Sequence, residues 1–190
     1  MNFSNTRTSQ TAAGSDARQV VKHVMQGNLY ATGESNTVLT TILGSCVATC
    51  LFDPQSKLGG MNHFLLPDAS DAQQGNNRYG VHAMELLIND LLRRGAKKSH
   101  MVAKIFGGAD MISNERAVGL RNVEFALAFL ENETIPCISQ SVGGRQARRI
   151  RFWPQTGQAK LKFIENDRSL YQNTTTSPTP RPKTGDIELF

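Results

Sequence analysis

Residues 37–66 read TVLTTILGSCVATCLFDPQSKLGGMNHFLL, and this stretch decides the fold. Apolar or β-branched runs at 37–43, 46–52 and 58–66 are separated first by a Gly-Ser pair and then by the polar segment DPQSK. A proline in a short polar segment between two apolar runs is typical of a β-hairpin. The stretch therefore predicts a strand, a glycine kink and a hairpin in succession.

Further strands and two helices are predicted on both sides of this hairpin. Residues 20–25 favour a strand, followed by a turn region with Gly27, Asn28 and Gly33. Apolar residues recur at helical spacing in 81–94, and a second amphipathic helix is expected within 114–131. The remaining predicted strands are 101–106, 135–142, 148–153 and 160–165. These elements predict a single-domain α/β (α+β) layered sandwich, with mixed, largely antiparallel sheets packed with two main helices.

The ends of the chain differ from its middle in composition. Residues 1–18 are polar and rich in Ser, Thr and Gln, and residues 168–190 include the proline-rich SPTPRPKTGD, so both are predicted to be flexible tails. The final IELF is apolar enough to dock on the domain or a partner, although a tail is the simpler prediction. The folded domain is expected to span 19–167.

Composition narrows the function classes. The formal net charge is +5 and the pI about 9.3, which suggests nucleic acid or an acidic protein as partner. Two clusters hold much of the positive charge, and neither has the interleaved aromatics of a base-stacking surface, so nucleic acid is disfavoured. The clusters are Arg93, Arg94, Lys97 and Lys98, and then Arg145, Arg148, Arg149 and Arg151. No run is long enough to span a membrane and no secretion signal is visible, so a cytoplasmic protein is expected.

The three cysteines do not predict a disulfide framework or a metal site. Cys46 and Cys50 are four residues apart, which in a strand separates them by about 13 Å, well beyond disulfide reach. The histidines at 23, 63, 82 and 100 add no zinc-type spacing, and no metal or cofactor is expected.

Cys46 is the best candidate for a catalytic thiol. It follows Gly44 and Ser45 directly after a strand, where the backbone can turn sharply and direct successive N–H groups at a developing oxyanion. A turn centred between Pro54 and Gln55 would pair Cys46 with a histidine across the hairpin.

That histidine is His63, a candidate proton acceptor and donor for the thiol. Thr40 and Thr41 end the preceding strand, and either could orient the imidazole. Because side chains alternate along a strand, only one of them can face the site, and the residues alone do not choose between them.

Several motifs of this sequence resemble those of one protein family. TTILGSCVATCLFDP and LGGMNHFLLPD resemble the chemoreceptor glutamine deamidases called CheD, which have a Gly-Ser-Cys nucleophile and a histidine seventeen residues later. The similarity continues through RYGVHAMELLINDLLRRGA, AKIFGGADM, VGLRNVEFA and SVGGRQARRI, and covers roughly 18–165. One departure is that the first arginine after Gly143-Gly144 is displaced by one position, so Arg145 is given no substrate role.

The resemblance implies a reaction and its residues. Cys46 would be the nucleophile and His63 the acid-base group, and the threonine six positions before the cysteine, Thr40, would orient the imidazole. Backbone N–H groups around Gly44 and Ser45 would hold the oxyanion. Selected glutamines on methyl-accepting chemotaxis receptors would be hydrolysed to glutamate through a thioester, with release of ammonia. The cytoplasmic helical bundle of the receptor would be the substrate, and a CheC-type phosphatase the partner.

Three alternatives remain open from the sequence. The chain could be a non-catalytic module that binds receptor or phosphatase, a receptor glutamate methylesterase, or a nucleic-acid binder. Arg78 and Tyr79 are expected to border the substrate groove, whereas the histidines other than His63 are expected to be structural or surface residues.

Overall fold

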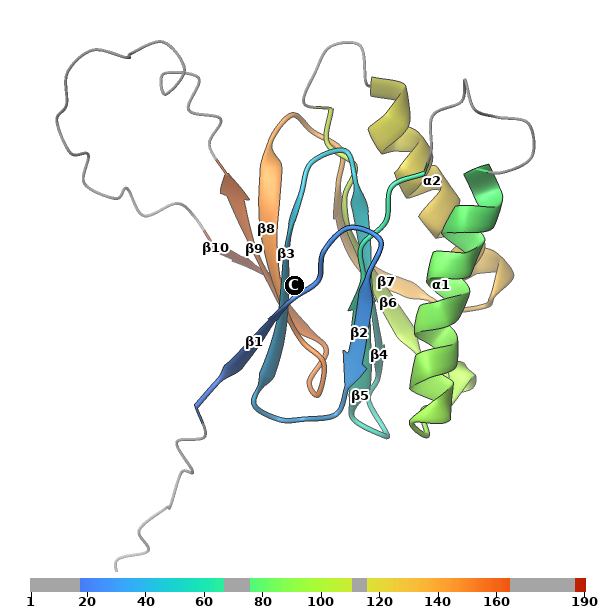
Figure 1. The fold of residues 1–190 in the computed structure, drawn as a ribbon, viewed down its shortest axis with the longest axis vertical. Helices are drawn as coiled ribbons and strands as arrows, with labels where there is room; N and C mark the ends of the chain where they lie inside the picture. Colours follow the sequence, from blue (N-terminus) through green and yellow to red (C-terminus); the bar gives the residue numbers. More distant parts are fainter. Residues whose placement is uncertain (1–17, 67–75, 111–115, 165–186) are drawn as a thin grey trace, which may run out of the picture.

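The computed structural model describes residues 18–66, 76–110, 116–164 and 187–190. They form two five-stranded sheets and two long helices stacked in three layers (Figure 1). The strands are β1 (Val20–His23), β2 (Leu29–Thr32), β3 (Thr37–Leu43), β4 (Val47–Asp53), β5 (Leu58–Asn62), β6 (Val102–Gly107), β7 (Cys137–Val142), β8 (Ala147–Trp153), β9 (Gln158–Ile164) and β10 (Ile187–Leu189). The helices are α1 (Asn76–Arg93), the 3-10 turn η2 (Lys98–His100) and α2 (Arg116–Asn132). The predicted α+β sandwich is confirmed.

One sheet has the order β1-β3-β8-β9-β10, and we call it the outer sheet. All its pairs are antiparallel except β1 with β3. The second sheet, the central sheet, has the order β2-β5-β4-β6-β7 and is antiparallel except for β6 with β7. The strand β2 lies where the sequence predicted only a turn region.

The hairpin of β4 and β5 forms as predicted, but the predicted pairing of its strands is wrong by two residues. Cys50 pairs with Met61, and an isolated bridge pairs Val47 with Phe64, so His63 lies opposite Ala48 instead of Cys46. The cause is a four-residue turn after Asp53, whose carboxylate accepts hydrogen bonds from two turn amides. A slip of two residues preserves the side-chain face, so Cys46 and His63 still belong to the same side of the sheet.

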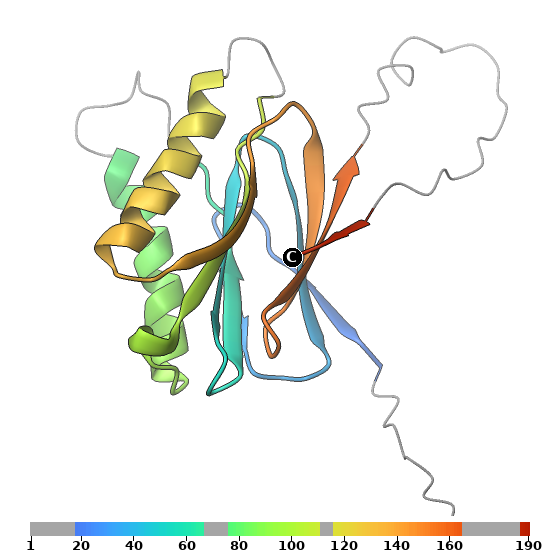
Figure 2. The same cartoon turned by 180° about the vertical axis from the view of Figure 1, so that it is seen from behind.

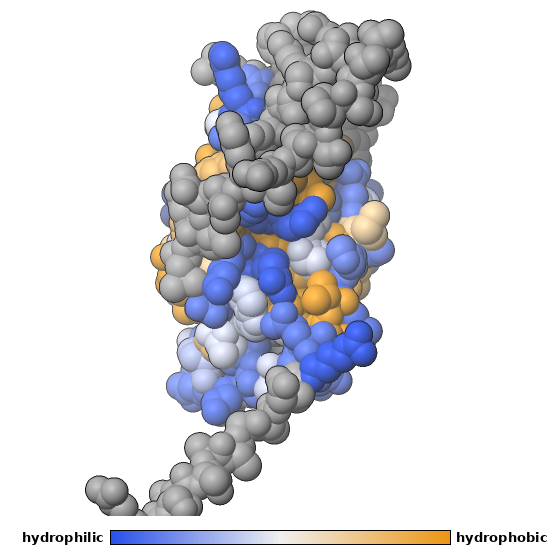
Figure 3. All heavy atoms as spheres, turned by 90° about the vertical axis from the view of Figure 1, so that its left-hand side faces the viewer, coloured by the Kyte–Doolittle hydropathy of each residue, from blue (hydrophilic) through white to orange (hydrophobic). Residues whose placement is uncertain are grey.

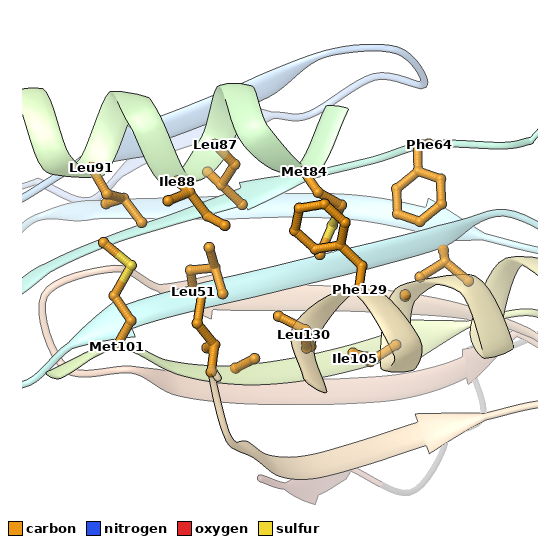
Figure 4. Close-up of a cluster of buried hydrophobic side chains, with 14 of the residues drawn as sticks. Leu51, Phe64, Met84, Leu87, Ile88, Leu91, Met101, Ile105, Phe129 and Leu130 are labelled. Atoms are coloured by element: carbon orange, nitrogen blue, oxygen red, sulfur yellow. The ribbon is translucent and has the colours of Figure 1, made fainter. Parts of the chain in front are cut away.

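Helices α1 and α2 cover one face of the central sheet (Figure 1). Their apolar stripes and the facing strand residues form a core that includes Leu51, Phe64, Met84, Leu87 and Leu130 (Figure 4). The predicted helices are confirmed, with α1 beginning five residues earlier than expected. Neither of these two described helices is long and apolar enough to cross a membrane.

A second core lies between the two sheets. It contains Leu39 and Leu43 from β3, Met61 from β5 and Phe106 from β6, all fully buried. Since alternate residues of β3 face this core, Thr41 points inward with Leu39 and Leu43. The candidate site lies at one end of this interface.

The last residues of the chain are not a free tail in the structure. Strand β10 pairs with β9 at the edge of the outer sheet (Figure 2). Phe190 exchanges two backbone hydrogen bonds with Ala159, and its ring lies 5.8 Å from that of Phe106. The docking of IELF that the sequence left open therefore occurs on the domain itself. The predicted N-terminal tail and most of the C-terminal one lie outside the described residues.

Candidate active site

Cys46 lies in the kink between β3 and β4, and its side chain is half-buried. Three consecutive carbonyls of this kink are held by neighbouring groups. The Ala109 amide donates to the Gly44 carbonyl at 2.7 Å, and the Gly108 amide donates to the Cys46 carbonyl at 2.8 Å. The carbonyl of Ser45 between them accepts from the Asn122 side chain at 2.9 Å.

This pattern determines where the amides of the kink point. In a trans peptide the C=O and the following N–H point in opposite directions. The N–H groups of Ser45 and Cys46 are therefore directed away from the elements that hold the carbonyls. Among the described residues, neither amide donates to a backbone carbonyl. That these two donors hold an oxyanion beside the thiol stays a prediction.

Two glycines allow the backbone to approach the kink this closely. Gly107 has a φ of 112° and Gly108 a φ of 65°, a region that favours glycine. A Cβ on Gly119 of helix α2 would lie 2.6 Å from the Gly108 carbonyl oxygen. The helix and the Gly-Gly turn therefore pack backbone against backbone, directly behind Cys46.

Asn122 joins the two halves of the site and was missed by the sequence analysis. It is fully buried on α2, where its Oδ1 accepts from the Leu66 amide at 2.8 Å while its Nδ2 donates to Ser45. One side chain thus fixes both the kink at Cys46 and the segment after His63. The contact to Ser45 spans 77 residues, so no local motif could have revealed it.

His63 follows β5 and is buried at 7% exposure. It occupies the position opposite Ala48, so Cys46 lies one diagonal step away on the same face, at about 7–8 Å between Cα positions, and the two side chains form no hydrogen bond in the structure. Its backbone is tied to the segment after β1, because its carbonyl accepts from the Gly27 amide and its amide donates to the Asn28 carbonyl.

The hydrogen bonds of His63 select its tautomer. Nδ1 lies 3.2 Å from the Val24 carbonyl oxygen, which can only accept, so Nδ1 carries the proton. Nε2 is then the free base, and it has no hydrogen-bond partner among the described residues. A buried, unpaired acceptor of this kind is suited to receive a proton from a thiol or a substrate.

The threonine that contacts the imidazole in the structure is Thr41, whereas the family resemblance gave this position to Thr40, whose catalytic role stays a prediction. Thr41 Oγ1 lies 2.9 Å from His63 Nδ1, whereas Thr40 Oγ1 donates to the Ile150 carbonyl of β8 at 2.7 Å. The even spacing from Thr40 to Cys46 misleads because β3 ends at Leu43, and the kink after it breaks the alternation of side chains.

Burial shifts both titratable groups toward their neutral forms. Desolvation raises the pKa of the Cys46 thiol, partly offset by its own backbone amide. Desolvation lowers the pKa of His63, partly offset by the Val24 hydrogen bond. The resting pair is therefore a neutral thiol and a neutral imidazole.

A glutamine side chain contacts the thiol in this resting state. Cys46 Sγ donates to the Gln26 Oε1 at 3.3 Å, a contact the sequence analysis missed because Gln26 is distant in the chain. Gln26, Thr41 and His63 all line a pocket of about 580 Å³. Cys46 does not itself line this pocket, but its thiol contacts Gln26, which does.

The other predicted residues separate into those near the site and those away from it. Tyr79 and Arg78 line a different pocket, although the Tyr79 hydroxyl lies close to Gly27. Arg148 is buried and donates to the carbonyls of Ser141 and Gly143, so it supports the Gly-Gly turn of residues 143 and 144. In the described part of the chain, no group of three or more His, Cys, Asp or Glu residues could hold a metal ion.

The matching family model and the similar proteins all point to the same family. The sequence model described as "CheD chemotactic sensory transduction" matches residues 65–163. A probable chemoreceptor glutamine deamidase CheD of Caulobacter vibrioides (strain NA1000 / CB15N) is 47% identical over 177 residues, covering 91% of this chain and 95% of its own. Proteins with the same description from Agrobacterium fabrum and Cereibacter sphaeroides are also similar. The first is 48% identical over 88% of this chain and 95% of its own, and the second 50% identical over 77% and 74%.

Solved structures give a weaker likeness. A crystal structure of a Neisseria meningitidis protein aligns with 66% of this chain and 64% of its own, at 9% identity and a TM-score of 0.43, which is too low to support a conclusion. The sequence relatives are decisive, because identity near one half extends over nearly the whole chain. The chain belongs to the CheD family.

Proposed function

We propose that this protein is a cysteine-dependent hydrolase that deamidates glutamine side chains of chemoreceptors to glutamate. The observation that carries the proposal is the arrangement around Cys46. Among the described residues, the amides of Ser45 and Cys46 donate to no backbone carbonyl, and Nε2 of the nearby His63 has no hydrogen-bond partner. The printed function of the CheD relatives, probable chemoreceptor glutamine deamidase, supports the same reaction.

The first half of the reaction forms a thioester. The target amide takes the place of the Gln26 side chain, and His63 Nε2 accepts the proton of the Cys46 thiol. The sulfur attacks the amide carbon, and the Ser45 and Cys46 amides hold the resulting oxyanion. His63 then returns the proton to the departing nitrogen, the C–N bond breaks, and ammonia leaves.

The second half hydrolyses the thioester. His63 deprotonates a water molecule, which adds to the acyl carbon, and the carbon–sulfur bond breaks. Glutamate and the free thiol are the products. Throughout, the Val24 carbonyl and the Thr41 hydroxyl hold Nδ1, which leaves Nε2 as the nitrogen that exchanges protons.

The proposal is tested with a chemoreceptor cytoplasmic fragment that carries glutamines. We expect its intact mass to rise by the replacement of an amide NH₂ by OH at selected glutamines, with one ammonia released for each. A fragment whose mass is unchanged, although it binds the protein, would contradict the proposal and favour a binding module. Release of methanol from a methylated fragment, with no ammonia from the glutamine form, would favour a methylesterase. The CheC-type phosphatase remains a predicted partner.

A further inference from the structure

The two basic clusters seen in the sequence differ in how far they are neutralised. At the end of α1, Asp90 pairs with Arg93 at 3.4 Å and with Arg94 at 3.2 Å, and Lys98 pairs with Glu133 at 2.6 Å. These cations already have carboxylate partners. The first cluster is therefore a poor candidate for binding an acidic protein.

The second region lies on the exposed face of the outer sheet. Arg149 and Arg151 alternate with the buried Ile150 and Phe152 along β8, so they point away from the core. Lys160 and Lys162 on β9 are exposed between buried or partly buried residues and also point away from the core. We call these four residues the basic face.

The basic face has few anions around it. The strands β1, β3, β8 and β9 contain no aspartate or glutamate, and Glu188 of this sheet belongs to the edge strand β10. None of the salt bridges among the described residues involves a residue of the basic face. Positive charge therefore accumulates here, and no ion pair within the described part of the chain neutralises it.

Part of the basic face is held in place before any partner binds. The Arg151 guanidinium lies 5.3 Å from the centre of the Trp153 ring, and the Lys160 ammonium lies 5.5 Å from it. Arg151 also donates to the Gln19 side chain at 2.6 Å. Side chains ordered in this way lose less conformational entropy when a ligand binds.

The basic face adjoins the candidate active site. Arg149 and Arg151 line the same pocket as His63 and Gln26. Three exposed apolar side chains, Val21, Met25 and Ile42, line it too. Figure 3 looks onto this side of the molecule and shows an apolar area (orange) bordered by hydrophilic residues (blue). A pocket with cations and apolar groups at its rim fits an amphipathic acidic helix.

We propose that this surface binds a helix of the substrate and that Arg149 and Arg151 pair with carboxylates flanking the target glutamine. On a helix, side chains three or four positions from the glutamine share its face, so they reach the rim when the glutamine enters the pocket. The apolar rim residues contact the same helix. The inference rests on the proposed deamidase function and adds a sequence preference to it.

The test compares two helical peptides with wild-type protein and two double variants. Both peptides carry one central glutamine. The residues three and four positions away from it are glutamates in the acidic peptide and alanines in the neutral peptide. The variants are R149Q/R151Q on the basic face and R93Q/R94Q at the end of α1, which removes equal charge elsewhere. Circular dichroism and thermal unfolding check that each variant folds.

For the acidic peptide we expect R149Q/R151Q to raise KM by roughly 3- to 25-fold, the effect of two exposed ion pairs, with kcat little changed. The neutral peptide is expected to show no such change, and R93Q/R94Q to behave as wild type with both. Added salt is expected to remove most of the wild-type preference for the acidic peptide.

Several results would overturn the inference. Equal KM values for both peptides with the wild-type protein would do so, as would a loss in R149Q/R151Q that is the same for both peptides. A charge-reversed pair gives a second test, because R149E/R151E is expected to prefer a peptide with lysines at the flanking positions. If wild type deamidates no peptide and no receptor fragment, the proposed function itself fails, which is a distinguishable outcome.

Discussion

Thr40 and Thr41 are adjacent residues of β3 whose hydroxyls have different partners. Thr41 contacts His63 Nδ1, and Thr40 contacts the Ile150 carbonyl of the neighbouring strand. The family resemblance pointed to Thr40, whereas the geometry favours Thr41 as the residue that positions the imidazole. Which hydroxyl supports catalysis is a question for a pair of conservative variants.

Thr41→Val is expected to lower kcat by about 10- to 100-fold, because a misoriented imidazole loses part of the roughly 10²–10⁴ that a placed acid-base group contributes. It is also expected to move the acid limb of the pH profile. Thr40→Val is expected to act mainly on stability, by about 1 kcal/mol for the lost hydrogen bond. Steady-state ammonia release measures kcat, and urea unfolding measures the free energy of unfolding. A larger loss of kcat in Thr40→Val than in Thr41→Val would favour the original assignment.

The burial of His63 predicts the pH dependence. Protonated His63 cannot act as a base, and burial lowers its pKa, so the group stays neutral to a lower pH than an ordinary histidine. The acid limb of kcat/KM is therefore expected to have its midpoint below about pH 6.5. His82→Gln, which changes an exposed histidine on α1, is the control and is expected to leave the midpoint unchanged. A midpoint above that of an ordinary histidine would be inconsistent with a buried neutral base.

At the scale of elements, α2 supports the kink at Cys46. It contributes Asn122 to the Ser45 carbonyl and presents Gly119 to the Gly108 backbone. A side chain at 119 would separate the helix from the turn that holds the Cys46 carbonyl. Packing of α2 and geometry of the site are thereby coupled.

Gly119→Ala is expected to lower the free energy of unfolding by about 1–2 kcal/mol, because overpacking outweighs the gain in helix propensity. The rate of ammonia release is expected to fall as well, since the Cys46 carbonyl loses its fixed donor. Leu120→Ala, at a position 55% exposed on the same helix, should change stability by less than about 0.5 kcal/mol. Wild-type stability and activity in Gly119→Ala would show that the close approach has no role.

Several features of these elements were predictable from the sequence, and the exceptions have physical causes. Helices and most strands follow from periodicity, which reports local burial. The hairpin register was not predictable, because Lys57 adopts a positive φ of 56° in a four-residue turn. Strand β2 was missed because it has only four residues next to a glycine-rich turn. Asn122 and Gln26 reach the site only through non-local contacts.

At the scale of the whole molecule, the two sheets are joined at one edge by the end of the chain. Phe190, which follows the edge strand of the outer sheet, packs against Phe106 of the central sheet. Phe106 belongs to β6, whose last residue is the first glycine of the turn behind Cys46. A chain of contacts therefore runs from Phe190 through Phe106 to the turn behind Cys46.

Phe190→Ala is expected to lower the free energy of unfolding by about 1–2 kcal/mol, less than the roughly 3–5 kcal/mol for a fully buried phenylalanine. Chemical denaturation monitored by circular dichroism measures the change. An unaltered midpoint would mean that residues 187–190 behave as the tail that the sequence first suggested.

The most direct test of the account compares two cysteine variants on one substrate. Cys46 and Cys137 are both half-buried free thiols, and desolvation raises the pKa of each, but only Cys46 lies in the kink with available amides. Ammonia release from a chemoreceptor fragment is measured with Cys46→Ala and with Cys137→Ala. We predict no release above background with Cys46→Ala and a wild-type rate with Cys137→Ala. Release that persists in folded Cys46→Ala would contradict the central role of this sulfur.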